Sequence, residues 1–123
     1  MNQSILVVDD SKVLRLMIVS VLKKAGVSTD FDEASDGIEG LKLVAGRHYD
    51  LIITDLNMPN MGGVDFVKQV RVSPLNKFVK VCVLSGEPDK DIEEEARKAG
   101  ASAFLLKPFD PPKLLSAVKR LLS

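Results

Sequence analysis

Apolar residues along this chain fall into short runs, separated by longer stretches in which apolar and polar residues mix. The runs lie at residues 5–8, 51–53, 81–84 and 103–106. Three of them are dense in aliphatic side chains without alternation, which is typical of strands buried on both faces of a parallel sheet. A weaker run at residues 31–34 contains Asp32 and Glu33, which favours an edge strand. The pattern therefore predicts five strands.

The stretches between these runs repeat their apolar residues at helical spacing. The apolar positions of five predicted helices lie within residues 13–22, 38–44, 64–70, 92–99 and 114–122. Gly26 and Gly100 stand where the first and fourth helices should stop. Asp36 with Glu39 three residues later resembles a capping box, and Asp110, followed by proline, is a good N-cap for the last helix.

Alternation of strands and helices favours an α/β fold with a doubly wound parallel sheet. Right-handed crossovers place helices on both faces of such a sheet. An edge position for the second strand favours the flavodoxin-like strand order 2-1-3-4-5. At 123 residues the chain has room for one domain, and we expect that domain to span residues 1–123.

Composition narrows the classes of function. Lys plus Arg and Asp plus Glu both number 17, so no basic excess indicates binding to nucleic acid or a membrane surface. The first residues lack the basic region of a signal peptide, and no apolar run is long enough to span a membrane. The single Cys82 cannot form an internal disulfide and should be a small core residue, while His48 falls in a polar turn. We expect a cytoplasmic protein.

Reactive side chains follow four of the predicted strands. The pairs and single residues at these strand ends are Asp9-Asp10, Asp55, Ser85-Gly86 and Lys107-Pro108. In a sheet of the predicted order these ends are neighbours, and ligands gather beyond the carboxyl ends of parallel strands. Two carboxylates ~4 Å apart repel by roughly 4 kcal/mol at an effective dielectric of about 20. A hard divalent cation would relieve this repulsion, and Mg²⁺ fits the oxygen ligands best.

The other groups at this edge suit an anion. Lys107 cannot bind a metal but can pair with an anion, and the Ser85 hydroxyl and the Gly86 N–H can donate hydrogen bonds to it. Glycine would let the anion approach the backbone closely. A metal, an ammonium and N–H donors together suit a phosphoryl group. A carboxylate such as Asp55 can then act as the nucleophile and carry the phosphoryl group.

These residues carry a resemblance to a known family. The acidic pair at residues 9–10, the D-x-x-M-P-x-M-x-G stretch at 55–63, Ser85-Gly86 and Lys107-Pro108 occur in order at the predicted strand ends. With these motifs, residues 4–122 resemble a receiver domain of two-component response regulators, nearest in size to the single-domain chemotaxis type. The resemblance implies a phosphorylation-dependent switch that receives its phosphoryl group from a histidine kinase or a histidine phosphotransfer domain.

The resemblance also implies roles for the residues that form the metal site. Asp55 would be the phosphoacceptor. Asp10 and Asp55 would bind Mg²⁺ directly, Asp9 would act through water, and Asn57 would offer its backbone carbonyl. The 107–108 peptide bond would be cis, a state that proline makes accessible.

In the same family, Ser85 and Lys107 would contact the phosphoryl oxygens, together with the backbone of Gly86 and Asn57. Movement of Ser85 towards the phosphoryl group would couple to the aromatic residue three positions before the lysine, here Phe104. This residue lacks the hydroxyl of a tyrosine. Asn57 and Glu87 would flank the path of the hydrolytic water, and their combination predicts a short-lived phosphorylated state. Such a protein is not an enzyme with a separate substrate, because it catalyses only its own phosphoryl transfer and dephosphorylation.

A downstream protein would bind through the fourth helix, fifth strand and fifth helix, the usual output surface of the family. On the fourth helix, Glu93 with Arg97 and Glu94 with Lys98 have the i,i+4 spacing of ion pairs. We expect a monomer that could pair through this surface when phosphorylated.

Three alternatives fit parts of the pattern. A haloacid-dehalogenase-type phosphatase also uses an aspartyl nucleophile and Mg²⁺, but it needs a second acid where this chain has Asn57. A flavodoxin-like FMN binder needs a hydroxyl- and glycine-rich loop where this chain has Asp9-Asp10. The chain could also be a receiver cut from a longer regulator, although its end at Ser123 without a linker favours a stand-alone protein.

Overall fold

Five strands and five helices alternate along the computed structural model, which describes residues 2–86 and 89–123. The strands are β1 (Ser4–Val8), β2 (Asp30–Ala34), β3 (Leu51–Asp55), β4 (Lys80–Ser85) and β5 (Ala103–Leu106). The helices are α1 (Lys12–Lys24), α2 (Gly37–Gly46), α3 (Gly63–Arg71), α4 (Lys90–Ala99) and α5 (Pro111–Leu122). Each predicted strand and helix is therefore present, with ends that differ by a few residues.

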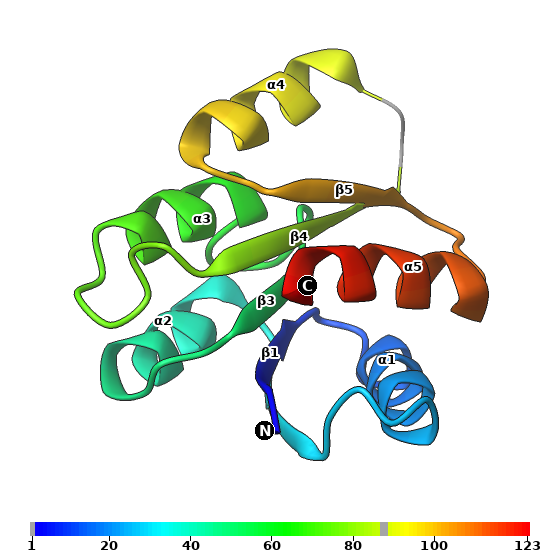
Figure 1. Cartoon of the computed structure of the whole chain (residues 1–123). Coiled ribbons are helices and arrows are strands. Elements are labelled where there is room, and N and C mark those ends of the chain that lie inside the picture. Colours follow the sequence, from blue (N-terminus) through cyan, green and yellow to red (C-terminus); the bar gives the residue numbers. More distant parts are fainter. Residues whose placement is uncertain (1, 87–88) are drawn as a thin grey trace.

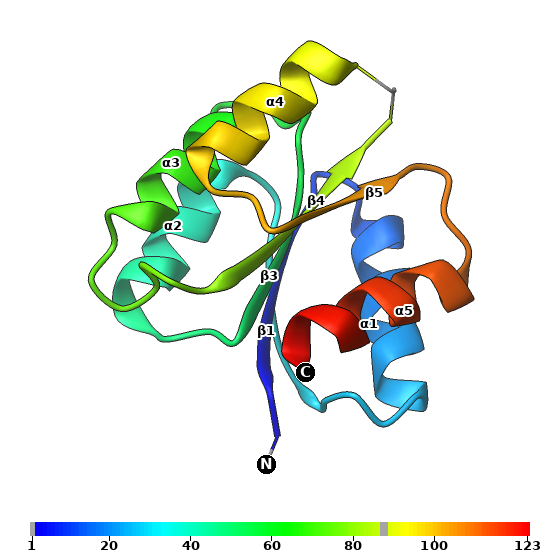
Figure 2. The same ribbon diagram turned by 45° about the horizontal axis from the view of Figure 1, so that its top comes forward.

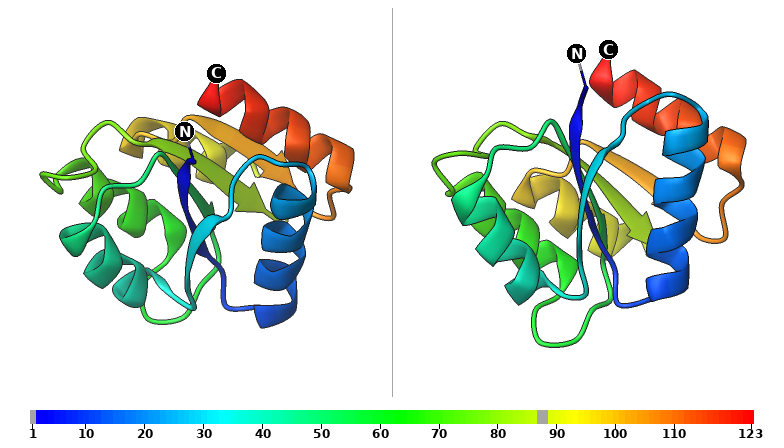
Figure 3. Two further views of the ribbon diagram at one scale, coloured as in Figure 1. Left: turned by 60° about the horizontal axis from the view of Figure 1, so that its bottom comes forward. Right: turned by 90° about the horizontal axis from the view of Figure 1, so that it is seen from below.

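The strands form one parallel sheet in the order β2-β1-β3-β4-β5, which confirms the predicted doubly wound topology. Helices α1 and α5 cover one face of the sheet, and α2, α3 and α4 lie side by side on the other (Figures 1 and 2). The two groups of helices remain on opposite sides of the strands when the molecule is viewed from below (Figure 3). Among the described residues, no helix is both long and apolar enough to cross a membrane.

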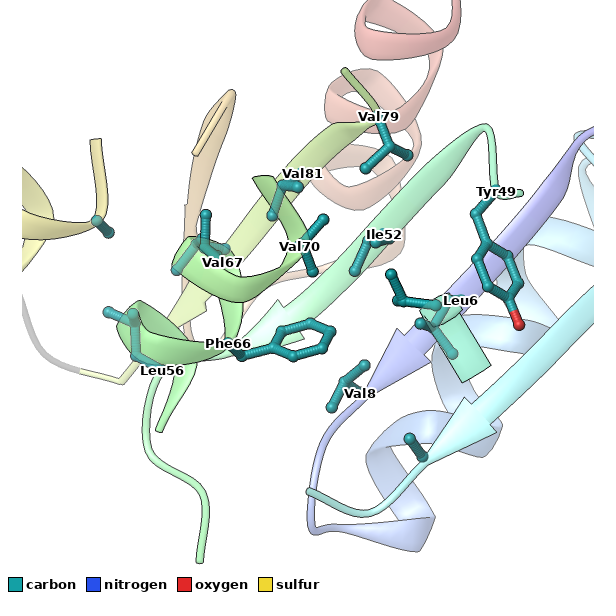
Figure 4. Close-up of a cluster of buried hydrophobic side chains, with 14 residues drawn as sticks. Leu6, Val8, Tyr49, Ile52, Leu56, Phe66, Val67, Val70, Val79 and Val81 are labelled. Carbon is teal, nitrogen blue, oxygen red and sulfur yellow. The ribbon is translucent and has the colours of Figure 1, made fainter. Parts of the chain in front are cut away.

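The two faces of the sheet bury two separate hydrophobic clusters. Leu6, Val8, Ile52, Val81 and Val83 point towards α2, α3 and α4, where Phe66 and Tyr49 fill much of the space (Figure 4). The alternate residues of the same strands point towards α1 and α5; they are Ile5, Val7, Leu51, Ile53, Cys82 and Leu84. Because successive residues of a strand point to opposite faces, both sets must be apolar. This explains the runs without alternation and confirms Cys82 as a core residue.

The helix ends use the residues that the sequence indicated. Gly26 and Gly100 have φ angles of 75° and 117°, in the left-handed region that glycine adopts readily. The Asp110 carboxylate caps α5 by accepting a hydrogen bond from the Lys113 N–H at 2.9 Å. At α2 the capping box is half formed: Asp36 accepts from the Glu39 N–H at 2.8 Å, whereas the Glu39 carboxylate accepts from the hydroxyl of Ser35, also at 2.8 Å.

Two surface predictions had different outcomes. His48 is exposed in the turn before β3, as expected. On α4, the ion pair of Arg97 is with Glu94, three residues earlier, at 3.0 Å, and not with Glu93 as the i,i+4 spacing predicted. The guanidinium of Arg97 lies 5.3 Å from the centroid of the Phe104 ring, and this contact draws the side chain towards β5.

Candidate functional site

Three carboxylates meet at the carboxyl end of the sheet. Asp9 and Asp10 follow β1, and Asp55 is the last residue of β3. Each offers an oxygen, and these oxygens all lie within 4.8 Å of one another. Asp9 is fully buried and Asp55 is 5% exposed, whereas Asp10 is exposed. Buried carboxylates this close together need a compensating positive charge.

Lys107 supplies one such charge. Its Nζ lies 3.1 Å from Asp9 Oδ2 and 3.3 Å from Asp55 Oδ1. The Lys107 N–H also donates to the Ser85 carbonyl at 2.7 Å, which extends the pairing of β4 and β5 to the site. The Lys107–Pro108 peptide bond is cis, as the family resemblance implied. The structure thus brings together Asp9, Asp55 and Lys107, although 46 positions separate the first two and 52 the last two, as the predicted strand order requires.

The site retains excess negative charge, and the pKa shifts reflect this. Burial raises the pKa of Asp55; the Lys107 ammonium opposes the shift and the Asp9 charge adds to it, so the pKa lies above its usual range. Burial acts to lower the pKa of Lys107, but attraction to Asp55 and Asp9 outweighs this effect and the pKa is raised. One ammonium faces three carboxylates, so the set fits a divalent cation bound by oxygen ligands.

Local hydrogen bonds fix Asp9 in place. Asp9 Oδ1 accepts a hydrogen bond from the Ser11 N–H at 2.9 Å, and the hydroxyl of Ser11 caps α1 by accepting from the Leu14 N–H at 3.2 Å. The carbonyl of Asp9 accepts from Arg15, whose guanidinium also pairs with Glu33 at 3.0 Å. The contacts of Ser11 and Arg15 with Asp9 were not predicted from the sequence. The cap could have been predicted, because serine is a preferred N-cap residue and Ser11 lies three residues before the apolar Leu14 of the predicted helix.

The turn after β3 packs back onto Asp55. The Leu56 N–H donates to Asp55 Oδ1 at 2.9 Å, and the Gly63 N–H donates to the Leu56 carbonyl at 2.9 Å. A Cβ atom at Gly63 would lie 2.4 Å from the Asp55 carbonyl oxygen, so only glycine allows α3 to begin here. Asn57 is exposed within this turn. The motif at residues 55–63 therefore positions the carboxylate of β3 as well as the loop beside it.

Ser85 and Gly86 lie beside this cluster. Ser85 is the last residue of β4, is 6% exposed and pairs with Leu106 of β5. Gly86 is exposed, and a Cβ atom there would meet nothing within 4 Å. The close approach of an anion to this glycine stays a prediction. Glu87, assigned a role in dephosphorylation, lies outside the described residues.

Phe104 lies in β5, opposite Val83 of β4, and is half-buried against the cluster beneath α3 and α4. Its ring is also in contact with Arg97 of α4. The side chain is therefore placed between the strand that ends in Ser85 and a helix of the predicted output surface. Its role as a moving element stays a prediction.

Comparisons with known proteins agree with this arrangement. Residues 5–119 match the family model of the response regulator receiver domain. The chain is 30% identical to sporulation initiation phosphotransferase F of Bacillus subtilis, over 99% of this chain and 95% of that protein. It is 32% identical to the chemotaxis protein CheY of Thermotoga maritima, over 98% of each.

Solved structures show the same fold. The chemotaxis response regulator CheY4 of Vibrio cholerae superimposes with a TM-score of 0.92 and 37% identity, covering 99% of this chain and 100% of that one. The receiver domain of a sensor histidine kinase from Pseudomonas aeruginosa, solved with a magnesium ion in its active-site cleft, has a TM-score of 0.88 at 24% identity, covering 99% of this chain and 98% of that one. At 24% identity, this comparison shows only that the two chains share a fold.

Proposed function

Because the chain belongs to the response regulator receiver domain family, whose members act in phosphorylation-dependent signalling, we propose that Asp55 is its phosphoacceptor. The observation that carries the proposal is the position of the Asp55 carboxylate: it is buried at a strand end, 3.3 Å from Lys107 and within 4.8 Å of two further carboxylates. The comparisons support neither a dehalogenase-type phosphatase nor an FMN binder.

In the proposed reaction, an oxygen of Asp55 attacks the phosphorus of a phosphohistidine in a sensor histidine kinase or a histidine phosphotransfer domain. A P–O bond to Asp55 forms as the P–N bond to histidine breaks, and the electron pair stays on the imidazole nitrogen, which takes up a proton. Contacts of Asp55 Oδ1 with the Leu56 N–H and Lys107 hold the carboxylate in one orientation, so little rearrangement is needed for attack.

We propose that Mg²⁺ is held by Asp9, Asp10 and Asp55 with the backbone carbonyl of Asn57. Three carboxylates against one ammonium support this assignment. When bound, the ion neutralises charge on the carboxylates and on the phosphoryl oxygens. Asp10 is exposed, so an ion from solvent can reach it directly. Asp9 is buried and already pairs with Lys107, so we assign it a contact with the ion through a water molecule.

The remaining groups at this edge would bind the phosphoryl oxygens. Lys107 can exchange a carboxylate partner for a phosphoryl oxygen with little movement, since it already lies between Asp9 and Asp55. The Ser85 hydroxyl and the backbone of Gly86 and Asn57 would complete the donors. Attack of water on the aspartyl phosphate would end the signal, with Asn57 beside its path.

We further propose that residues 1–123 act as one receiver unit whose output surface is α4, β5 and α5. A shift of Ser85 towards the phosphoryl group would open space for Phe104 to turn inward. The ring would then leave Arg97, whose contact with it at 5.3 Å ties β5 to α4. A downstream protein, or a second phosphorylated copy, would read this change.

Intact-mass measurement after incubation with Mg²⁺ and acetyl phosphate tests the proposal. We expect one added phosphoryl group that depends on Mg²⁺ and is absent from Asp55→Asn. Asp65→Asn is the matched control, because Asp65 is an exposed acid on α3 and this variant should accept the group normally. An adduct of equal yield on Asp55→Asn would contradict the assignment.

A further inference from the structure

The loop between α3 and β4 lies at the end of the sheet opposite the carboxyl ends of the strands (Figure 1). It exposes three apolar side chains. Val72 is 72% exposed, Leu75 is 45% exposed and Phe78 is 88% exposed. Single exposed apolar residues are common on protein surfaces, but three within seven residues make a local concentration. This loop takes no part in the function proposed above.

The loop is held firmly although three of its apolar side chains are exposed. Asn76 is 1% exposed; its Oδ1 accepts from the Tyr49 N–H at 2.7 Å, and its Nδ2 donates to the carbonyls of Val44 at 2.9 Å and Arg47 at 2.8 Å. These bonds join the loop to the end of α2 and the start of β3. The loop backbone is therefore ordered before any partner arrives, which lowers the entropy lost on binding.

Arg71 holds the loop backbone on both sides of Phe78. The guanidinium of Arg71 donates to the carbonyl of Lys77 at 3.1 Å and to that of Val79 at 2.6 Å. Val79 is 6% exposed and belongs to the core. These bonds hold the backbone on both sides of Phe78, whose side chain faces solvent.

A pocket of about 280 Å³ lies beside this ring. Its lining residues come from the turn before β3 and from the α3–β4 loop: His48, Tyr49, Asp50, Pro74, Leu75, Lys77, Phe78, Val79 and Lys80. Both lysines are exposed. The one carboxylate of the lining, Asp50, accepts a hydrogen bond from the Ser4 N–H at 2.8 Å. The lining therefore mixes apolar and polar groups: Leu75 and Phe78 offer exposed apolar surface, and the two lysines outnumber the one carboxylate.

We propose that this α3–β4 pocket, defined by the lining residues above, binds a short segment of a partner protein in which acidic residues flank one apolar or aromatic side chain. The apolar side chain would enter beside Phe78 and Leu75, and the acids would pair with Lys77 and Lys80. An anionic membrane is disfavoured because surface binding usually needs a larger basic cluster, and a hollow suits an inserted side chain. Face-to-face pairing of two copies would oppose like charges.

The pocket would work independently of the acidic site. Lys80 begins β4 and Ser85 ends it, so the two sites are separated by about 17 Å of strand. A partner could occupy the pocket while a kinase or a downstream protein uses the other end of the sheet. The pocket would thus tether the receiver to a partner in both signalling states.

Selection of short random peptides displayed on phage against the immobilised wild-type chain tests this proposal, with Phe78→Ser as the counter-selection target. We expect the enriched peptides to carry acidic residues around a leucine or an aromatic residue. A synthetic enriched peptide, measured by fluorescence anisotropy, should bind Phe78→Ser and Lys77→Glu/Lys80→Glu at least about tenfold more weakly. All three side chains are exposed, so the variants should fold as the wild type does, and thermal unfolding of each variant checks this.

Val13→Ser and Lys24→Glu are the matched controls, because they change an exposed apolar residue and an exposed lysine on α1. These variants and Asp55→Asn should bind the peptide as the wild type does. Failure to enrich peptides, enrichment of peptides without acids, or equal binding to Phe78→Ser would overturn the proposal. So would Phe78-dependent sedimentation with phosphatidylserine vesicles, or a dimer that Phe78→Ser abolishes.

Discussion

At the scale of single residues, burial of the Asp55 carboxylate lowers the stability of the folded chain, although the proposed function requires this carboxylate. Asp55 is buried beside Asp9 and its pKa is raised, so the folded chain holds the proton on this carboxyl more tightly than the unfolded chain does. The stability that this group contributes is therefore present at low pH and is lost as the pH rises through its folded pKa. At neutral pH, the ionised carboxylate costs stability.

Asp55→Asn should accordingly raise the melting temperature of the metal-free protein at neutral pH, and the gain should vanish below the pKa of an ordinary aspartate. A gain of about 1 kcal/mol would correspond to roughly 4 °C in a domain of this size. Thermal unfolding in EDTA at several pH values measures it. A variant less stable than the wild type at neutral pH would show that the Lys107 pair outweighs the burial and repulsion.

In the proposed site, Lys107 would compete with Mg²⁺ for the same carboxylates. Lys107→Met keeps most of the apolar stem but removes the charge that lies 3.1 Å from Asp9 and 3.3 Å from Asp55. We expect Mg²⁺ to bind this variant about tenfold more tightly, equivalent to about 1.4 kcal/mol, while phosphorylation by acetyl phosphate slows. Isothermal titration calorimetry gives the affinity. Unchanged affinity would mean that the ammonium and the ion do not share the site.

At the scale of elements, the start of α3 sets the position of the β3 carboxylate. Gly63→Ala would place a Cβ atom 2.4 Å from the Asp55 carbonyl oxygen, and the turn would have to move. We expect a loss of about 1–3 kcal/mol in the free energy of unfolding, together with slower phosphorylation. Urea unfolding and the mass assay measure the two effects.

Gly46→Ala is the control for that change. Gly46 ends α2, and a Cβ atom there meets nothing within 4 Å, so this variant should be neutral or slightly stabilising. If Gly63→Ala behaved in the same way as Gly46→Ala, the turn would not be positioned by close contact with β3.

The buried amide of Asn76 joins the α3–β4 loop to the end of α2 and the start of β3. Asn76→Ala would leave the Tyr49 N–H and the carbonyls of Val44 and Arg47 without this partner. We expect destabilisation of about 2–3 kcal/mol, because each buried group that loses its bond retains its desolvation cost. Urea unfolding measures it, and Gln69→Ala, at an exposed amide on α3, should change little. A change below about 0.5 kcal/mol would mean that water replaces the amide.

At the scale of the whole molecule, the sequence allowed the sheet order and the convergence of Asp9, Asp55 and Lys107 to be predicted. Strands buried on both faces leave an unmistakable apolar signal, and the topology then determines which strand ends meet. The finer arrangement could not be predicted. Asp9 is buried, accepts a hydrogen bond from the Ser11 N–H and pairs with Lys107, whereas its neighbour Asp10 is exposed, and this difference depends on the local backbone path.

The exposure of Phe78 could not be predicted from the sequence either. Phe78 and Val79 are consecutive apolar residues directly before β4, and one is 88% exposed while the other is 6% exposed. The loop path is held by the Arg71 guanidinium on the carbonyls that flank Phe78, and by Asn76, which bonds to Val44, Arg47 and Tyr49 far earlier in the chain. The hydrophobicity of the loop residues does not reveal these contacts.

The most direct test of the account is to locate the phosphoryl group. The chain is phosphorylated with acetyl phosphate and Mg²⁺, reduced with borohydride, digested and sequenced by tandem mass spectrometry; reduction converts an aspartyl phosphate to homoserine. We predict this conversion at Asp55 and at no other acid of the chain. Conversion at Asp9 or Asp10, or the absence of any converted residue from a chain that binds Mg²⁺, would contradict the assignment of Asp55 as the phosphoacceptor.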